Sequence, residues 1–388
     1  MLTTGWLEVT EGDVPEALRR VLRMLLESSV VEALLVPQAT PAGDNVVSTL
    51  VADPDRLERV ALLAPVFPVH GATLAARLTK TLSEGRLGVF LRPCEVRGLV
   101  ELAKLKQVQV ERLFVIGVDC LGAYPVSTYA RLAREQDLVT PLLESASSGE
   151  MGPVAGAAFR EACQICEQPV PGRYAWEGEA ASYHPDLAFG LFGAPLPGKV
   201  FVQVRDGTVA EALGVTPGEP PREREPVIQQ LVARRKEARD AAFQAMRGRL
   251  QGIEGLLEVF STCIRCHNCM VNCPICYCPE CIFRTPTFDH LSAQYVDWAR
   301  RKGAIRMPTD TLLFHLTRLN HMATSCVGCG MCTEACPSEI SVATVFRSVG
   351  ERVQALFDYL PGRSLEEDLP LATFREDELT AEGVSYNV

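Results

Sequence analysis

Apolar residues recur at helical spacing over residues 14–28, and a valine- and leucine-rich run follows over 30–36. This order predicts a helix followed by a strand. A second strand is predicted over 45–52, a helix beginning at Asp53-Pro54, and a further helix over 74–82. Helices and strands therefore alternate from the start of the chain.

The clearest strand signals are two continuous apolar runs, Leu87–Leu91 and Leu113–Val118. The first run ends at Arg92-Pro93-Cys94, and a helical pattern over 95–106 joins it to the second. A strand–helix–strand order predicts a parallel pair with a right-handed crossover. We therefore expect an α/β domain with a partly parallel sheet, to which 201–204 adds a late strand.

A proline-rich, charged stretch over 217–226 is typical of an exposed linker. A charged helix follows over 227–250. We expect its apolar stripe to contain Leu231, Ala238, Phe243 and Met246, with Arg234, Arg235 and Lys236 facing water. The predicted units are an α/β domain (1–216), a linker with the charged helix (217–254), a cysteine-rich ferredoxin-like α+β domain (255–345) and an acidic, loose or partner-bound tail (346–388).

Composition narrows the function classes. The chain has 388 residues, 47% of them hydrophobic and 22% charged, as in a globular protein of two or three domains. A net charge of −10 argues against nucleic-acid binding, which needs a basic face. The sequence contains neither an export signal nor an apolar run of ~18–20 residues, so we expect a cytoplasmic protein without a membrane span.

Fifteen cysteines are the main chemical feature, and eleven of them lie between Cys263 and Cys336. In a reducing compartment, clustered cysteines bind metal more often than they form disulfides. One spacing occurs twice: Cys263-x2-Cys266-x2-Cys269-x3-Cys273-Pro274 and Cys326-x2-Cys329-x2-Cys332-x3-Cys336-Pro337.

This spacing is typical of two-cluster ferredoxins, where the fourth cysteine of each run ligates the other cluster. It predicts one 4Fe-4S cluster on Cys263, Cys266, Cys269 and Cys336, and another on Cys326, Cys329, Cys332 and Cys273. A pair of zinc sites is the alternative, but zinc requires only two CxxC pairs per site.

Two features of this region concern packing around the clusters. The segment 309–319 begins with a capping residue and has helical periodicity, so we expect a helix that packs over the clusters. Gly328 and Gly330 suit the tight backbone around a cubane, although either could be an ordinary turn residue.

Four more cysteines lie in the first domain. Cys94 and Cys120 each follow a predicted parallel strand, so both should lie at the same carboxyl edge of the sheet. With the pair Cys163 and Cys166 they supply four thiolates, enough for a third 4Fe-4S cluster. The alternatives are small buried residues at Cys94 and Cys120, and a zinc half-site or redox pair at Cys163 and Cys166.

Cys276, Cys278 and Cys281 remain as lower-ranked metal ligands, because three thiolates do not complete the four ligands of a cubane. A fourth ligand could come from His267, His290, a partner subunit, or the Cys163/Cys166 pair. Alternatively, the three thiols pack against the neighbouring clusters. We expect His315 and His321 to be packing or surface residues.

The sequence contains no glycine-rich nucleotide-binding motif: neither G-x-G-x-x-G after a strand nor a P-loop occurs.

The segments 87–99, 114–120 and 163–166 resemble the beta subunits of coenzyme F420-reducing hydrogenases and formate dehydrogenases, where a Gly-x-Pro-Cys turn, a strand-end cysteine and a CxxC occur in this order. The run 263–281, with Cys-Pro-Ile-Cys-Tyr-Cys, is particularly similar to the formate dehydrogenase subunits. Two positions depart from the family: Arg92 replaces a small residue, and Glu11-Gly12-Asp13 stands without the Ser-Gly-Gly common in flavin-binding members.

The resemblance implies an oxidoreductase subunit for electron transfer, with FAD and several 4Fe-4S clusters. It implies a cytoplasmic complex with a formate dehydrogenase, a nickel–iron hydrogenase or a heterodisulfide-reductase-like module, with a flavin, such a module or ferredoxin as acceptor. Binding of the deazaflavin coenzyme F420 is left open. The alternative function is a self-sufficient reductase of a small substrate with ferredoxin as electron donor; a third, an iron–sulfur sensor or scaffold, would carry labile clusters and lack a flavin.

Overall fold

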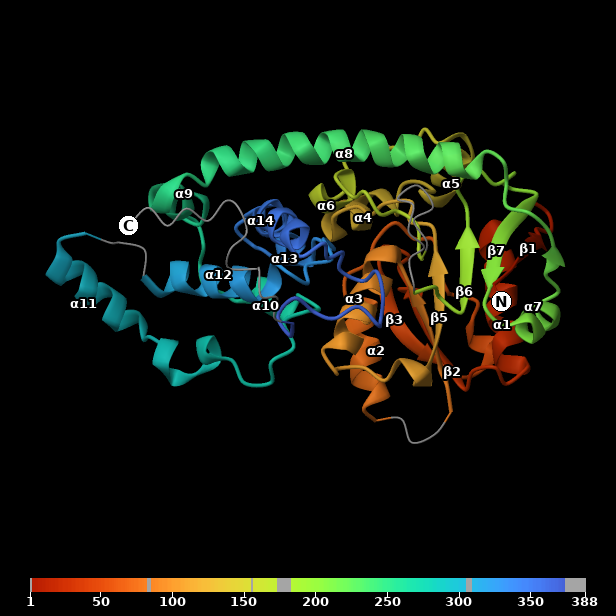
Figure 1. Cartoon of the computed structure of the whole chain (residues 1–388), viewed down its shortest axis with the longest axis horizontal. Coiled ribbons are helices and arrows are strands. Elements are labelled where there is room, and N and C mark those ends of the chain that lie inside the picture. Colours follow the sequence, from red (N-terminus) through yellow and green to blue (C-terminus); the bar gives the residue numbers. More distant parts are fainter. Residues whose placement is uncertain (1, 82–84, 155, 173–182, 305–308, 374–388) are drawn as a thin grey trace.

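The structure is a computed structural model that describes residues 2–81, 85–154, 156–172, 183–304 and 309–373. A mixed sheet lies at one end of the molecule and the cysteine-rich region at the other (Figure 1). None of the described helices is both long enough and apolar enough to cross a membrane.

Within the described residues the sheet has eight strands in the order β3-β2-β4-β5-β6-β7-β1-β8. The strands are β1 (Thr3–Glu8), β2 (Ala33–Ala39), β3 (Val46–Val51), β4 (Leu87–Leu91), β5 (Leu113–Val118), β6 (Leu187–Gly190), β7 (Lys199–Val204) and β8 (Thr216–Pro217). The central pairs β2–β4, β4–β5 and β5–β6 are parallel, and the outer pairs are antiparallel. This arrangement confirms the predicted α/β class with a partly parallel sheet.

Seven helices accompany the sheet within the described residues. They are α1 (Val14–Glu27), α2 (Gly71–Thr79), α3 (Pro93–Lys104), α4 (Val126–Leu132), α5 (Val139–Ser148), α6 (Glu161–Gln164) and α7 (Gly207–Ala212). The buried Glu95 accepts hydrogen bonds from the backbone N of Arg92 (2.9 Å) and of Gly71 (2.6 Å), so one carboxylate fixes the starts of α3 and α2.

Three sequence expectations for this domain need correction. The helix expected at Asp53-Pro54 is a single 3-10 turn, Pro54–Arg56, and the strand expected over 30–36 begins only at Ala33. Helix α3 begins at Pro93 rather than at residue 95, because proline suits the first helical turn. Cys94 therefore lies in the first turn of a helix and not in a loop.

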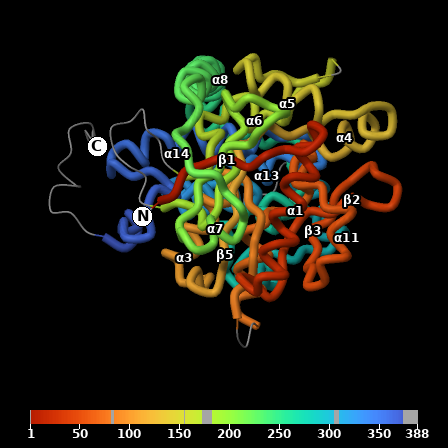
Figure 2. The backbone as a smooth tube through the Cα atoms, turned by 90° about the vertical axis from the view of Figure 1, so that its right-hand side faces the viewer, coloured from red at the N-terminus to blue at the C-terminus, as the bar shows by residue number. Residues whose placement is uncertain are grey.

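A long helix, α8 (Arg224–Arg249), connects the two ends of the molecule along one side (Figure 1). Figure 2 shows it end-on above the rest of the chain. It begins within the expected linker, at Arg224. Leu231, Phe243 and Met246 are buried as expected, whereas Ala238 is exposed and Arg235 is buried, with its guanidinium 3.4 Å from the carbonyl oxygen of Cys166.

The cysteine-rich region contains α9 (Gly252–Val259), α10 (Asn268–Val271), α11 (Ser292–Lys302), α12 (Thr309–Met322), α13 (Met331–Glu334) and α14 (Val342–Leu356). Helix α14 crosses the expected boundary at residue 346, because its buried face packs into the core of this region. Beyond it, the chain returns to α3, where Glu101 accepts hydrogen bonds from the Tyr359 hydroxyl (2.6 Å) and the Gly362 backbone N (2.8 Å). The described start of the tail is thus docked on the sheet domain.

Candidate metal centres

Four predicted ligands, Cys263, Cys266, Cys269 and Cys336, line one cavity of about 320 Å³. We call these four residues the first thiol group. Phe314, Ile340 and Val342 complete an apolar wall around the sulfurs. The two cysteine runs are far apart in the sequence. In the structure, Cys336, the fourth cysteine of the second run, nevertheless lies beside the first three cysteines of the first run.

The two cysteine runs share one backbone conformation. In the second run, the residues on either side of Cys329 are Gly328 (φ 69°) and Gly330 (φ 72°). In the first run, the equivalent positions around Cys266 are Arg265 (φ 58°) and His267 (φ 60°). A left-handed backbone costs ~1–2 kcal/mol for residues with a side chain. Here the Arg265 guanidinium pairs with Asp310, and the His267 ring lies 4.6 Å from that of Phe314.

The second thiol group consists of Cys273, Cys326, Cys329 and Cys332. Burial, and after it the charge of Cys273, raises the pKa of the Cys329 thiol to about 12. The same two causes, in the same order, raise the pKa of Cys332. Cys273 therefore faces the cysteines of the other run, as the exchanged-ligand pattern predicts.

The third thiol group consists of Cys94, Cys120, Cys163 and Cys166. Burial raises the pKa of Cys120 to about 12, and the charges of Cys163 and Cys166 contribute to the rise. Burial also raises the pKa of Cys94, and the charges of Glu95 and then of Cys120 add to the rise. The four thiols that the sequence assigned to a third cluster thus gather beyond the carboxyl ends of β4 and β5.

The second and third thiol groups are neighbours. Cys94, Cys163 and Cys329 pack around one small apolar cluster made of Phe67, Ala123 and Met331. Gly330 allows this close approach, because a Cβ at that position would lie 2.3 Å from the Cβ of Ala162, beside Cys163. The two cysteine-bearing domains are therefore joined through their thiol groups.

Helix α12 brings three side chains to the sulfurs, as its predicted position over the clusters requires. Arg318 Nη1 lies 3.1 Å from Cys269 Sγ, and its Nη2 donates to the carbonyl oxygen of Cys269 (3.0 Å). His315 Nε2 lies 3.3 Å from Cys263 Sγ, and Met322 Sδ lies 3.8 Å from Cys273 Sγ. Hydrogen bonds to ligand sulfurs raise the reduction potential of a cluster.

His315 is correctly expected to be a packing residue, but it also contacts a predicted ligand. Its ring stacks on Phe260 with the centroids 3.8 Å apart. Burial lowers the pKa of His315 to about 3, so the ring is neutral near pH 7. A thiolate only accepts, so the contact with Cys263 requires the tautomer that carries hydrogen on Nε2. The i, i+3, i+7 spacing of His315, Arg318 and Met322 is the signal that would have placed all three on one helix face.

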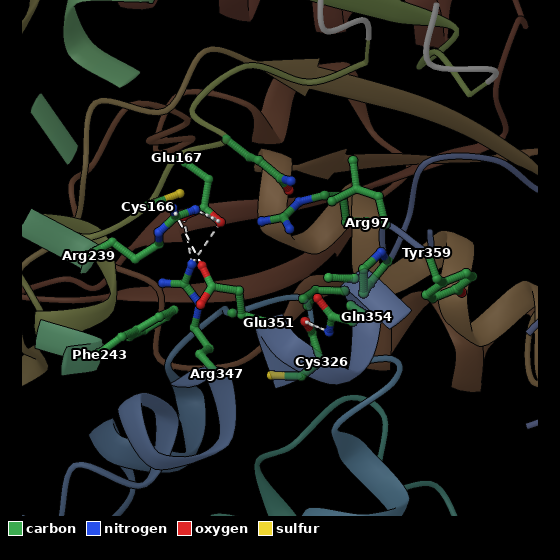
Figure 3. Close-up of a pocket in the computed structure, with 16 residues that line it drawn as sticks. Arg97, Cys166, Glu167, Arg239, Phe243, Cys326, Arg347, Glu351, Gln354 and Tyr359 are labelled. Carbon is green, nitrogen blue, oxygen red and sulfur yellow. Dashed lines mark hydrogen bonds and ion pairs between the residues drawn. The ribbon is translucent and has the colours of Figure 1, made fainter. Parts of the chain in front are cut away.

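A second cavity, of about 770 Å³, reaches both Cys166 and Cys326 (Figure 3). Arg347 Nη2 binds both carboxylate oxygens of Glu167 (2.9 and 2.6 Å), and Arg239 lies 3.7 Å from the same carboxylate. Arg347 also donates to the carbonyl oxygen of Ile165 (3.1 Å). These contacts from α8 and α14 hold the segment 165–168, which follows α6, against the cysteine-rich region.

Asp119, the residue before Cys120, fixes the end of β5. This buried carboxylate accepts from the backbone N of Leu191 (2.8 Å) and of Phe192 (3.0 Å). Arg224 Nη1 and Nη2 bind its two oxygens at 2.5 and 2.9 Å. Asp119 therefore connects β5, the segment after β6 and the start of α8 beside a predicted ligand. No sequence motif predicts this ion pair.

The remaining three cysteines line the largest of the cavities described here, of about 1970 Å³, which also contains Cys273. We call Cys276, Cys278 and Cys281 the fourth thiol group. Two fourth ligands considered from the sequence lie elsewhere: His267 lines the first cavity, and His290 packs between Tyr295 and Trp298. Cys163 and Cys166 lie with Cys94 and Cys120.

The residues present fit four-iron clusters. Each cysteine of a cubane binds a different iron, so the sulfurs surround a cavity rather than a point. The first thiol group has this arrangement. No three described His, Cys, Asp or Glu side chains converge closely enough to hold a single metal ion. Near the third group, Arg160 keeps a buried Nη1 without a hydrogen-bond partner among the described residues, a donor that a cluster sulfide would satisfy.

The start of α1 does not fit the phosphates of a flavin dinucleotide. Phosphates bind at helix N-termini through free backbone N–H groups and favourable charge. Here Asp13 caps the helix and accepts from the backbone N of Glu16 (2.8 Å), so a carboxylate already holds the site. Glu11 and Glu16 add negative charge. Arg92, the other departure from the family, donates to the carbonyl oxygens of Ala64 (3.0 Å) and Val66 (2.7 Å).

Comparison with known proteins agrees with the cysteine pattern. Residues 258–340 match the family of 4Fe-4S dicluster domains. The F420-dependent formate dehydrogenase subunit beta of Methanocaldococcus jannaschii is 26% identical over 384 residues, covering 91% of this chain and 93% of the relative. The F420-dependent formate dehydrogenase 1 subunit beta of Methanococcus maripaludis is 25% identical, covering 93% and 94%.

Among solved structures, a chain of the F420-reducing NiFe hydrogenase complex from Methanosarcina barkeri, studied by xenon derivatization, is 12% identical. The match has a TM-score of 0.42 and covers 62% of this chain and 92% of that chain. The resemblance expected from the sequence is confirmed by the curated relatives. Over most of its length this chain is related to the beta subunits of F420-dependent formate dehydrogenases, which are oxidoreductase subunits, and it carries a 4Fe-4S dicluster domain.

Proposed function

We propose that this chain is the electron-transfer beta subunit of a formate dehydrogenase or hydrogenase complex. In this proposal the first, second and third thiol groups each hold one 4Fe-4S cluster. Electrons pass between a metal-containing catalytic subunit and an acceptor that is a flavin on another subunit, a ferredoxin or a heterodisulfide-reductase-like module.

The observation that carries the proposal is the continuity of the three thiol groups. Cys269 lies in the one-turn helix α10 and Cys273 lies two residues after its end; the two cysteines belong to the first and second groups. Cys329 of the second group raises the pKa of Cys94 of the third, a mark of their proximity. Electron tunnelling falls steeply with distance, so adjacent clusters form a path whereas isolated ones do not.

The ligand shells support an electron-transfer role rather than substrate binding at the first three groups. Each group supplies four cysteines, which leaves no iron open to a substrate. Arg318 and His315 donate to sulfurs of the first group, and hydrogen bonds of this kind set reduction potentials. The clusters would carry single electrons, and these side chains would hold the ligand sulfurs and screen them from water.

We route no step through a flavin on this chain. The family resemblance implies FAD, but Asp13 caps the helix start at which the flavin-binding segment would lie. We therefore assign two-electron chemistry to the partner subunits.

The test is the substitution Cys94→Ala in the whole complex. We expect about four fewer irons per chain, the cluster signals of the ferredoxin-like domain retained in low-temperature electron paramagnetic resonance, and acceptor reduction by formate or hydrogen lowered at least tenfold. Unchanged iron content together with an unchanged rate would contradict the third cluster. Turnover of a small substrate by the isolated chain with reduced ferredoxin would instead support the self-sufficient reductase.

A further inference from the structure

The three-cluster path leaves the fourth thiol group unused. Cys276, Cys278 and Cys281 stand within six residues of each other and line one cavity together. Burial raises the pKa of Cys276 to about 11, followed by the charges of Cys273 and, more weakly, of Cys281 and Cys278. The three cysteines therefore line a common space.

From this arrangement we infer a fourth 4Fe-4S cluster, bound by Cys276, Cys278 and Cys281, with one iron that carries no cysteine and faces the cavity. This site goes beyond the proposed function, which requires only the first three groups. Cys273 does not serve it, because the ferredoxin spacing, in which the fourth cysteine of each run ligates the other cluster, assigns Cys273 to the second group.

The charge of the cavity fits such a cluster. A cubane with three thiolates is an anion, and a partly buried anion needs opposite charge nearby. Arg77, Lys80, Arg284 and Arg318 line the cavity, whereas Glu280 is its one acidic residue among those described. Thiols that merely pack against neighbouring clusters would not need this excess of cations.

Space and position also fit. The cavity is larger than that of the first thiol group, to which we also assign a cubane. The wall of this cavity also includes the polar residues Thr317, His321 and Ser325, none of which supplies a fourth thiolate. Cys278 is exposed, and the neighbouring Val271, Tyr277 and Ile282 are 52%, 40% and 57% exposed. The fourth cluster would therefore be the outermost one, next to the second through Cys273.

The substitution Cys278→Ala tests the inference, because this thiol is exposed and its loss leaves the core intact. In the anaerobically purified complex we expect about sixteen irons on the wild-type chain and about twelve on the variant, at four per cluster. Glu280→Gln, in the same loop, is the control and should keep all sixteen.

A second readout depends on the open iron. A cluster with three cysteines loses its unligated iron on mild oxidation, so ferricyanide should produce a 3Fe-4S signal in the wild-type chain and none in Cys278→Ala. Three results would overturn the inference: about twelve irons on the wild-type chain, equal iron in wild type and variant, or the loss of one zinc in place of four irons. The first of these leaves the three-cluster path intact, whereas failure of the Cys94→Ala test leaves the fourth site intact.

Discussion

Arg318 Nη1 lies 3.1 Å from Cys269 Sγ, in a setting where the arginine is only 3% exposed. The same guanidinium donates to the carbonyl oxygen of Cys269, so two hydrogen bonds fix its plane. A buried positive charge beside a ligand sulfur favours the reduced, more negative state of a cluster.

Replacing Arg318 should therefore lower the reduction potential of the cluster on the first thiol group. For Arg318→Met, which keeps the length but removes charge and donors, we expect a fall on the order of 50 mV, from ~1 kcal/mol of lost hydrogen bonding. Arg318→Lys should retain part of the effect. Redox titration followed by electron paramagnetic resonance measures the shift; a potential that does not move in Arg318→Met would show that the contact has no electronic role.

Gly330 should be important for stability for two reasons: its backbone is left-handed, and it packs directly against Ala162. Gly330→Ala is expected to lower the free energy of unfolding by ~2–4 kcal/mol, the sum of left-handed strain and a clash in a packed site. Gly303 has a similar φ of 68° and open space around it, so Gly303→Ala separates the two causes and should cost only ~1–2 kcal/mol. Chemical denaturation under anaerobic conditions compares them, and equal losses would mean that the approach to Ala162 is unimportant.

Asp119 should contribute to stability more than any surface ion pair. Asp119→Asn leaves Arg224 without its bidentate partner in a buried site, which is expected to cost ~3–5 kcal/mol. The exposed pair Asp297–Arg300 is the control, since Asp297→Asn should change stability by less than ~1 kcal/mol. Thermal unfolding of both variants measures the difference; similar melting temperatures would contradict the proposed role of the Asp119 ion pair.

Much of the fold could be predicted from local patterns. The runs Leu87–Leu91 and Leu113–Val118 are continuous buried strands, and their parallel pairing follows from the helix between them. The same rule placed Cys94 and Cys120 at one sheet edge without any motif. Cysteine spacing likewise predicted that Cys336 of the second run lies beside the first three cysteines of the other run, with which it lines one cavity.

What could not be predicted depends on tertiary contacts. Arg235 has the sequence signature of a solvent-facing residue, yet it is buried because α8 lies against the segment 165–168. The start of α8 at Arg224 depends on Asp119, more than a hundred residues earlier. The docking of residues 357–371 on α3 depends on Glu101, whose buried carboxylate has no local signal in a helix.

The most direct test of the account is native anaerobic purification, with iron, acid-labile sulfide and flavin quantified and copurifying chains identified. We predict at least about twelve irons and as many sulfides per chain, no flavin bound to this chain, and a formate dehydrogenase or hydrogenase catalytic subunit in the same complex. About eight irons on a chain that purifies without any partner would contradict it, because a two-cluster ferredoxin beside an unoccupied sheet domain offers no path between subunits.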